Sequence, residues 1–490
     1  MTSELAMVVA VLAPLAGAVL IAASHRHPNR RETATLATAV ALFILVLPLL
    51  EPVMAGERPG TTLWEIIPGI SISLEAEPLG MVFALVASFL WIVTSVYSIG
   101  YMRGHHEENQ TRFYVCFAIA ISSAIGVAFA ANMFTLFIFY EVLTLSTYPL
   151  VTHHGTDEAR RGGRTYLGLL LFTSIGFQLL AIVWTWSITG TLDFTVGGIF
   201  EDKVSPTLIG ILLLLYMFGI GKAALMPFHR WLPAAMVAPT PVSALLHAVA
   251  VVKAGVFTVL KVTVYVFGID LLADVHAKDL LLYVAAFTII AASLIAIRED
   301  NLKRRLAYST VSQLSYVVLG GMLVNEISVI GGGMHIAMHA FGKITLFFCA
   351  GAILVAAHKT NVSDLDGIGR VMPITMFAFL IGALSVIGLP PLGGSWSKFL
   401  LALGAARSDQ YVFVGVLMLS TLLNVAYLLP PVVRAFFLPP PNAPGQHISF
   451  NEAPLACLAS ICVTAAGSVL LFFFADPLYV LLEPIVITTR

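Results

Sequence analysis

Charged residues are scarce in this chain of 490 residues. Only 11% are Asp, Glu, Lys or Arg, and 59% are hydrophobic. A soluble globular protein carries about 25% charged residues, so this composition excludes a large solvated domain. The formal net charge is -1, which gives no basic excess of the kind that binds nucleic acid. The composition therefore predicts a membrane protein with no nucleic-acid role.

Cysteine and cofactor motifs are equally scarce. The four cysteines are isolated in apolar runs and form no CxxC pair: Cys116, Cys349, Cys457 and Cys462. An iron–sulfur site or a disulfide framework is thereby excluded. The chain also contains no GxGxxG or Walker sequence. We expect no cofactor and no metal site, and any redox or nucleotide chemistry would belong to partner subunits.

Long apolar runs, by contrast, recur along the whole chain. We count about fourteen, each near the roughly 20 residues that cross a bilayer as a helix. The fold class is therefore an all-α polytopic membrane protein. The opening residues, MTSELA, contain no basic residue, so we expect an uncleaved first span rather than a signal peptide.

The basic loops all fall on one side of these spans. They include HRHPNRR at 25–31, RGHHEENQTR at 103–112, HHGTDEARRGGR at 153–164 and REDNLKRR at 298–305. The loops between them are acidic or weakly charged. The positive-inside rule then places the basic loops in the cytoplasm and both termini outside a cytoplasmic (inner) membrane.

Two spans, 205–236 and 371–405, are too long for one straight helix and contain prolines and glycines. Matching interrupted spans in two halves of a chain are typical of inverted repeats with an ion site between them. We therefore predict a three-helix segment at 1–111, five-helix repeats at 112–267 and 268–437, and a C-terminal helix at 438–490. Each repeat would contain one discontinuous helix.

Arginine carries most of the basic charge of the loops, whereas most of the lysines lie inside the spans. Of nine lysines none precedes residue 203, and five lie in apolar runs: Lys222, Lys253, Lys261, Lys343 and Lys398. Glu141 is the one acid deep in a span. Each such charge facing lipid would cost about 3 kcal/mol, so the set must face protein or water. Lys261 lies near a span end, where its amine could reach the interface.

A row of buried lysines suits proton transfer, because burial brings their titration toward neutral pH, whereas arginine keeps its proton. His335, His339 and Lys343 follow one another at intervals of four residues and share a helix face. Histidine relays protons through both ring nitrogens. His247 lies six residues before Lys253, off its face, and is a weaker candidate.

A longer pattern carries a family resemblance. The segment GKAALMPFHRWLPAAMVAPTPVSALLHAVAVVKAGVF at 221–257, with Glu141 before it and HAFGKITLFFCAG after it, resembles the proton-antiporter-type membrane subunits. These occur in complex I, in energy-converting hydrogenases and in Mrp-type cation/proton antiporters. The resemblance implies fourteen helices with two inverted repeats. It also implies that Glu141 and Lys222 form a coupled pair, that Lys253 bridges the halves, and that His335, His339 and Lys343 lead to Lys398.

Length and the VSALLHA segment look most like the D subunit of Mrp antiporters. This implies a proton-translocating subunit of a multisubunit Na⁺/H⁺ antiporter, a secondary transporter rather than an enzyme. The alternatives are a pumping subunit of a complex I-like or hydrogenase-linked redox complex, and, ranked lower, a subunit of an inorganic-carbon uptake complex or a structural scaffold. The expected partners are other membrane subunits, the lipid bilayer and protons, with sodium handled elsewhere in the assembly.

Overall fold

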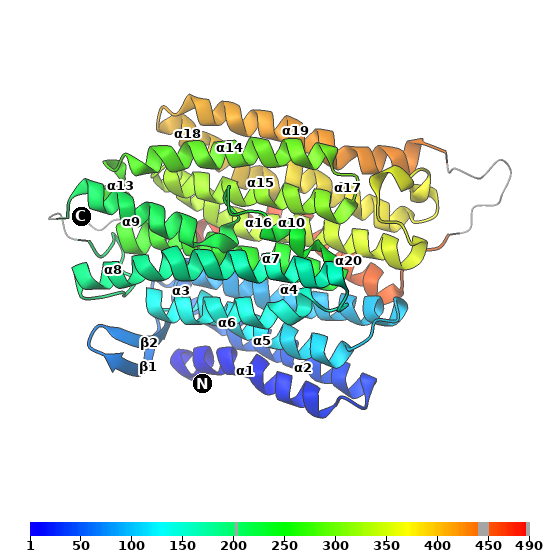
Figure 1. Cartoon of the computed structure of the whole chain (residues 1–490), viewed down its shortest axis with the longest axis horizontal. Helices are drawn as coiled ribbons and strands as arrows, with labels where there is room; N and C mark the ends of the chain where they lie inside the picture. The colour runs from blue at the N-terminus through cyan, green and yellow to red at the C-terminus, as the bar shows by residue number, and fades with distance from the viewer. Residues whose placement is uncertain (201–203, 440–449, 487–490) are drawn as a thin grey trace.

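The structure is a computed structural model that describes residues 1–200, 204–439 and 450–486. Its long helices run nearly parallel to one another, along the horizontal axis of Figure 1. Ten stretches of the described chain are helices long and apolar enough to cross a membrane. They are α1 (Ser3–Ala23), Pro28–Met54 with α2 (Pro28–Val46) and α3 (Leu50–Met54), α4 (Pro78–Gly104), α5 (Gln110–Ala128), α6 (Met133–Val151), Asp157–Thr189 with α7 (Asp157–Thr173) and α8 (Leu179–Thr189), α14 (Ala277–Arg298), α16 (Glu326–Ala357), α19 (Tyr411–Phe437) and α20 (Leu455–Phe473).

Four further segments complete the bundle. They are α9 (Pro206–Gly219) with its continuation α10 (Trp231–Ala234), α11 (Thr240–Ala244) with α12 (Val251–Lys261), α15 (Leu302–Met322), and α17 (Pro373–Ile387) with α18 (Gly394–Arg407). The short helices α13 (Ile269–Ala273) and α21 (Asp476–Leu482) flank the bundle. The described helices are consistent with the fourteen predicted spans, and the polytopic helical fold class is confirmed.

Both predicted helix breaks are present. In the first, α9 ends at Gly219, and only a short 3₁₀ turn (η3, Gly221–Ala223) precedes α10. In the second, α17 ends at Ile387, and α18 begins at Gly394, after a stretch that contains two prolines. At the second break Pro390 and Pro391 closely follow the end of α17, and proline, which removes a backbone donor, prevents the helix from continuing. At the first break α9 already ends at Gly219, before Pro227.

A β-hairpin, which the sequence did not predict, lies between α3 and α4. Strands β1 (Gly60–Ile67) and β2 (Ile70–Glu75) are antiparallel, and Ile67 faces Ile70 across a two-residue turn. Gly69 occupies that turn with φ +82°, a conformation that glycine adopts without strain. Asn132 caps α6 by accepting from the Thr135 N–H at 2.8 Å, and its amide donates to the Ser71 carbonyl of the hairpin at 3.0 Å.

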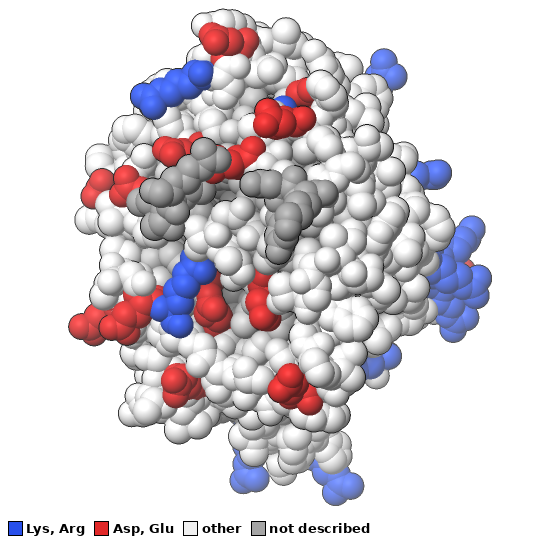
Figure 2. Space-filling model, turned by 90° about the vertical axis from the view of Figure 1, so that its left-hand side faces the viewer, with Lys and Arg blue, Asp and Glu red and all other residues white. Residues whose placement is uncertain are grey.

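The two ends of the bundle differ in charge. We define the acidic end as the end with the hairpin and the loops after α8 and α12, and the basic end as the opposite one, with loops 24–27, 105–109, 152–156 and 299–301. Figure 2 shows mainly Asp and Glu on the acidic end, with most Lys and Arg at its rim. Among its exposed residues are Glu57, Glu65, Asp193, Asp274 and Asp409.

A buried ion pair fixes the start of α4 near the acidic end. The Glu77 carboxylate accepts from the Leu79 and Gly80 backbone N–H groups, at 2.9 and 2.6 Å. It also lies 3.1 Å from the Lys261 amine and accepts from the Tyr265 hydroxyl at 2.7 Å. The expectation that Lys261 reaches the interface is wrong, because its side chain is only 1% exposed and is held by Glu77.

We predict that Glu77→Ala lowers the free energy of unfolding by about 3–5 kcal/mol, because the Lys261 ammonium then stays buried without its carboxylate. The measurement is denaturation of the purified protein in detergent. The double variant Glu77→Ala/Lys261→Met removes that orphaned charge, so it should be more stable than Glu77→Ala alone. If the single and double variants were equally stable, the lost stability would come from the missing Glu77 cap of α4 and not from the buried Lys261 charge.

Candidate functional site

The first helix break buries Lys222 in the middle of the bundle. Its neighbour Gly255 on α12 lies directly against the Lys222 backbone, and any side chain at position 255 would collide with it. The indole N–H of Trp231 donates to the Gly221 carbonyl at 2.9 Å, and the Lys222 N–H donates to the Tyr140 hydroxyl at 3.1 Å. The polar groups freed by the break are thus satisfied inside the protein, as membrane depth requires.

The Lys222 amine is held by uncharged oxygens of α6. It donates to the Tyr140 carbonyl at 2.8 Å and to the Thr144 hydroxyl at 2.6 Å, and it lies 3.1 Å from the centroid of the Tyr140 ring. The side chain is fully buried. A lysine amine can use three donors, and here two oxygens and the face of an aromatic ring receive them.

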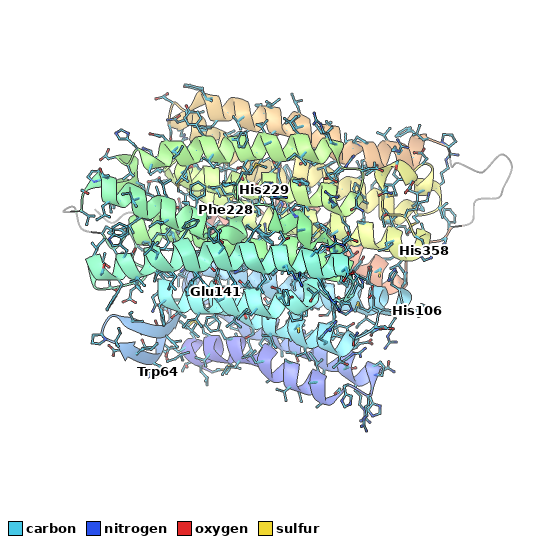
Figure 3. The ribbon with its side chains drawn as sticks, in the orientation of Figure 1. Trp64, His106, Glu141, Phe228, His229 and His358 are labelled. Atoms are coloured by element: carbon cyan, nitrogen blue, oxygen red, sulfur yellow. The ribbon has the colours of Figure 1, made fainter. Side chains whose placement is uncertain are left out.

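No hydrogen bond or ion pair joins Glu141 to Lys222 among the described residues. Glu141 follows Tyr140 on α6 and lies, along the bundle axis, between the hairpin residue Trp64 and the basic-end residue His106, nearer to Trp64 (Figure 3). Both carboxylate oxygens are buried, and neither has a hydrogen-bond partner among the described residues. The residue itself is partly exposed and is followed by the exposed Val142. Its charge still acts on Lys222 through space.

Lys253 and His339 join the two halves of the chain. The Lys253 amine on α12 lies 2.8 Å from Nδ1 of His339 on α16, and both side chains are buried. Whether Lys253 bridges the two halves in proton transfer stays a prediction, and this contact is the geometry that such a role would use. Nε2 of His339 is buried without a partner in the described structure.

From His339 the row of contacts continues through His335 toward α18. The rings of His339 and His335 stack with centroids 5.5 Å apart, and His335 stacks on Tyr316 of α15 at 5.6 Å. Nδ1 of His335 lies 2.9 Å from the Ser397 hydroxyl, next to Lys398. The structure thus brings Lys253, His339 and His335 together in one row that ends beside Lys398.

Lys343 leaves this row. It shares the helix face of the two histidines, but its amine donates to the Leu306 carbonyl of α15 at 3.2 Å. No hydrogen bond within the described residues joins it to His339. The shared face predicted from the sequence spacing is therefore present, while the amine points to a neighbouring helix.

Lys398 lies in the first turn of α18, beside the second break. Its amine donates to the carbonyl of Ile387, the last residue of α17, at 3.0 Å. It lies 4.9 Å from the Tyr316 ring centroid and 2.9 Å from an atom of the Asn424 side-chain amide. The acceptors of the Lys398 amine are uncharged, as are those of Lys222. One of the Lys398 acceptors is the carbonyl at the end of α17.

The uncharged members of this site were not predicted from the sequence. They are Tyr140, Thr144, Tyr316, Ser397 and Asn424, all buried. A signal existed for some of them, since Tyr140 and Thr144 flank Glu141 and Ser397 precedes Lys398. His247 belongs to a π-helical turn (η5, Leu245–Val249), and its side chain lies outside the described part of the structure.

A second polar cluster, centred on Glu107, lies at the basic end. The Glu107 carboxylate lies 3.0 Å from His105, 3.3 Å from His154 and 3.7 Å from His153. Nδ1 of His154 lies 3.2 Å from the Val237 carbonyl, so both of its ring nitrogens face acceptors. Only the doubly protonated ring can donate to both.

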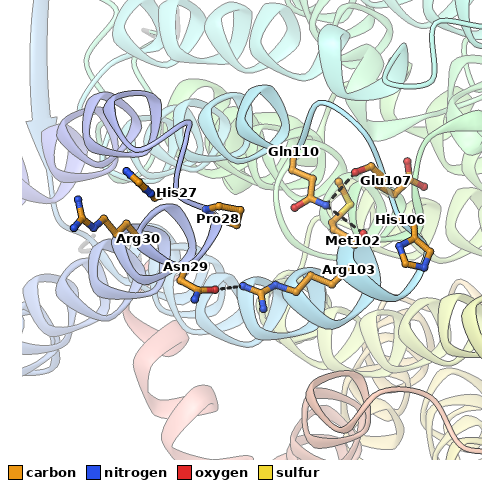
Figure 4. A pocket seen from close by; sticks show the side chains of 9 residues that line it. All are labelled: His27, Pro28, Asn29, Arg30, Met102, Arg103, His106, Glu107 and Gln110. Carbon is orange, nitrogen blue, oxygen red and sulfur yellow. Dashed lines mark hydrogen bonds between the residues drawn. The ribbon is translucent and has the colours of Figure 1, made fainter.

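A cavity of about 820 Å³ opens beside this cluster (Figure 4). Glu107 lines it together with the basic residues His27, Arg30, Arg103 and His106. Arg103 is fixed there by hydrogen bonds to Asn29 and to the Glu32 carboxylate. The Glu107 cluster is thus accessible from the basic end.

Comparison with known proteins identifies the family. The family described as "NADH:quinone oxidoreductase/Mrp antiporter, TM" matches residues 130–424. The chain belongs to this family. A second family, "NADH-Ubiquinone oxidoreductase (complex I), chain 5 N-terminus", matches residues 67–114. The resemblance inferred from 221–257 is therefore confirmed, and the site described above lies almost entirely within the larger match.

Relatives within this family fall into two groups. NADH-quinone oxidoreductase subunit N of Desulforudis audaxviator is 32% identical over 427 residues, which cover 84% of this chain and 83% of the relative. The D subunit of the Na(+)/H(+) antiporter of Alkalihalophilus pseudofirmus is 26% identical over 413 residues, covering 83% and 81%. The chain spans half of the longer chain 5 relatives that it matches.

The fold also matches a solved structure. A chain in the structure of the Mrp complex from Dietzia sp. superposes with a TM-score of 0.86 at 21% identity, covering 99% of this chain and 97% of that one. This likeness confirms the membrane fold.

The pKa values of the Glu107 cluster make the stability of the basic end depend on pH. The hydrogen bond to Glu107 raises the pKa of His154. A raised histidine pKa stabilises the folded state below the usual value of about 6.5, and this contribution is lost as pH rises through the folded-state pKa. Burial raises the pKa of Glu107, but the three histidines lower it overall, so its contribution is lost only in acid.

We predict that His154→Gln lowers the melting temperature at about pH 6 and has little effect at about pH 9, where His154 of the unmodified protein is neutral in both the folded and the unfolded state. Thermal unfolding of the purified protein across this range measures the difference. His25→Gln at the same end changes an exposed histidine and serves as the control. A constant difference between His154→Gln and the unmodified protein at every pH would contradict the prediction.

Proposed function

We propose that this chain is the proton-translocating subunit of a multisubunit Na⁺/H⁺ antiporter. Protons would pass along Lys222, Lys253, His339, His335 and Lys398, with Glu141 and Lys343 adjusting the charge of neighbouring lysines. The observation that carries this proposal is the 2.8 Å contact between Lys253 and His339. It joins two buried basic groups from the two halves of the chain at membrane depth.

Electrostatic coupling supports transfer along this row. Two lysine charges about 8 Å apart repel by roughly 2 kcal/mol at an effective dielectric constant of 20. Protonation of one lysine therefore favours release from the next. Because the described amines are held mainly by uncharged acceptors, their charge depends strongly on these neighbours.

The charge of the two ends supports one orientation of the chain in the membrane. Under the positive-inside rule the basic end faces the cytoplasm, and the Glu107 cavity would then open to cytoplasmic water. Both predicted half-channels would meet at the Lys253–His339 contact. The sequence contains a candidate proton path but no dense set of carboxylates and hydroxyls inside the spans that could bind sodium. We therefore assign sodium movement to other subunits.

A second candidate function is a pumping subunit of a redox complex. The 32% identity to a NADH-quinone oxidoreductase subunit N favours it, since the identity to the antiporter's D subunit is 26% over a similar length. In that case the row would carry protons in the same way, and the energy would come from redox subunits elsewhere in the complex. Dependence of proton movement on added Na⁺, rather than on a quinone substrate, separates the two functions.

We predict that Lys222→Met and Lys398→Met each reduce Na⁺-dependent proton movement at least about tenfold, because each removes a site that must gain and lose a proton. The assay uses everted membrane vesicles that contain the complete complex, with a pH-sensitive dye. Lys359→Met is the matched control, since Lys359 is a lysine of the loop after α16 and lies outside the row.

Both variants should still assemble, because methionine fills the volume of the lysine stem. Immunoblots of the purified complex measure assembly. Full transport by either assembled variant would overturn the proposed relay.

A further inference from the structure

The Asn424 side chain of α19 lies among four polar groups and next to Lys398. On one side of its amide are two donors, the Lys398 amine at 2.9 Å and the Gln313 amide nitrogen at 3.2 Å. On the other side are the Tyr427 hydroxyl at 2.5 Å and the Ser420 carbonyl at 3.3 Å. Asn424 is fully buried.

One amide orientation fits a charged lysine. With the oxygen toward Lys398, it accepts from Lys398 and Gln313, while the nitrogen donates to Tyr427 and to the Ser420 carbonyl. Every group then has a suitable partner. An ammonium needs such acceptors, because it has donors only.

The opposite orientation fits a neutral lysine. The amide nitrogen then lies 2.9 Å from Lys398 and can donate only if the amine offers a lone pair. The amide oxygen then accepts from the Tyr427 hydroxyl and lies 3.3 Å from the Ser420 carbonyl oxygen, which loses its donor, so this orientation costs one hydrogen bond. Gln313 completes this arrangement by turning its own oxygen toward Asn424, since that oxygen has no hydrogen-bond partner among the described residues.

The orientation of the amide also sets the direction of the next hydrogen bonds. The Tyr427 hydroxyl lies 2.8 Å from the Ser309 hydroxyl on α15, and either can donate. When Asn424 donates to Tyr427, the tyrosine is free to donate to Ser309. When Tyr427 donates to Asn424, Ser309 must donate to Tyr427. The charge on Lys398 is thereby linked to hydroxyl groups one and two steps away.

Among the described residues, the other groups around Lys398 carry no negative charge. Tyr316 faces it from α15, and the Ile387 carbonyl from α17. The titratable groups nearest to it on α16 are His335, which contacts Ser397 beside Lys398, and Lys343, and both are bases. No carboxylate of the described chain pairs with it, which leaves the amide of Asn424 as the adjustable acceptor.

We infer that Asn424 is a positioning residue whose amide rotates by half a turn as Lys398 gains and loses its proton, with Tyr427 and Ser309 reversing their hydrogen bonds in step. This inference rests on the proposed function, since it gives Lys398 a proton to exchange. The charge of Lys398 would then be controlled by uncharged side chains, whereas the charge of Lys222 would be controlled by the carboxylate of Glu141.

The test is the pH profile of transport in everted vesicles with the complete complex. Asn424→Asp offers acceptors in both orientations and keeps the proton on Lys398, so the alkaline midpoint should rise by about one pH unit or more. Asn424→Leu removes the acceptor, so the midpoint should fall. Structural damage alone would lower activity without moving the two midpoints in opposite directions.

Tyr427→Phe provides a variant without any change of charge. It removes the donor to the Asn424 oxygen in the neutral-lysine arrangement, whereas the charged arrangement keeps the Ser420 carbonyl. The midpoint should therefore rise. This variant keeps the test decisive if the Asn424 variants fail to assemble, as judged by immunoblot.

Midpoints that coincide with that of the unmodified complex would overturn the amide switch, as would Asp and Leu shifts in the same direction. Lys398→Met separates this failure from failure of the relay. If Lys398→Met transports normally, the proposed function is wrong. If it is inactive while the Asn424 and Tyr427 profiles do not move, only the switch is wrong.

Discussion

The fold depends on one constraint: a lysine amine in an apolar interior must find acceptors, and a regular helix offers few. Uncharged oxygens meet this need throughout the described row. Lys222 uses a hydroxyl one turn after a carbonyl on α6, and Lys398 uses the carbonyl that ends α17. The helix breaks are therefore part of the solvation of these lysines, since they place each amine beside groups that continuous helices would keep apart.

The two broken segments solve this problem differently. Lys222 has a carboxylate within electrostatic range, although Glu141 is partly exposed and makes no direct contact with it. Lys398 has no such neighbour and lies against the Asn424 amide instead. A carboxylate changes the charge of a lysine through its distance, and an amide does so through its orientation. The same type of site can thus be controlled by movement in one half and by rotation in the other.

The sequence predicted the parts of this structure that depend on local chemistry. The apolar runs predicted the helices, the prolines and glycines at 227–241 and 388–394 predicted the breaks, and the spacing of His335 and His339 predicted a shared face. The acceptors of each amine could not be predicted, because they come from residues up to 86 positions away along the chain. Lys261 shows the limit well: its position suggested the interface, but packing placed it against Glu77.

The contact between Lys253 and His339 restricts how much charge the row can hold. Two basic nitrogens 2.8 Å apart leave room for one hydrogen between them. If both groups were charged, two N–H bonds would point at each other, so the pair can hold one excess proton but not two. The centre of the row therefore has single occupancy. In the proposed relay, a second proton would enter this pair only after the first had left it, so the two halves of the protein would transfer protons alternately.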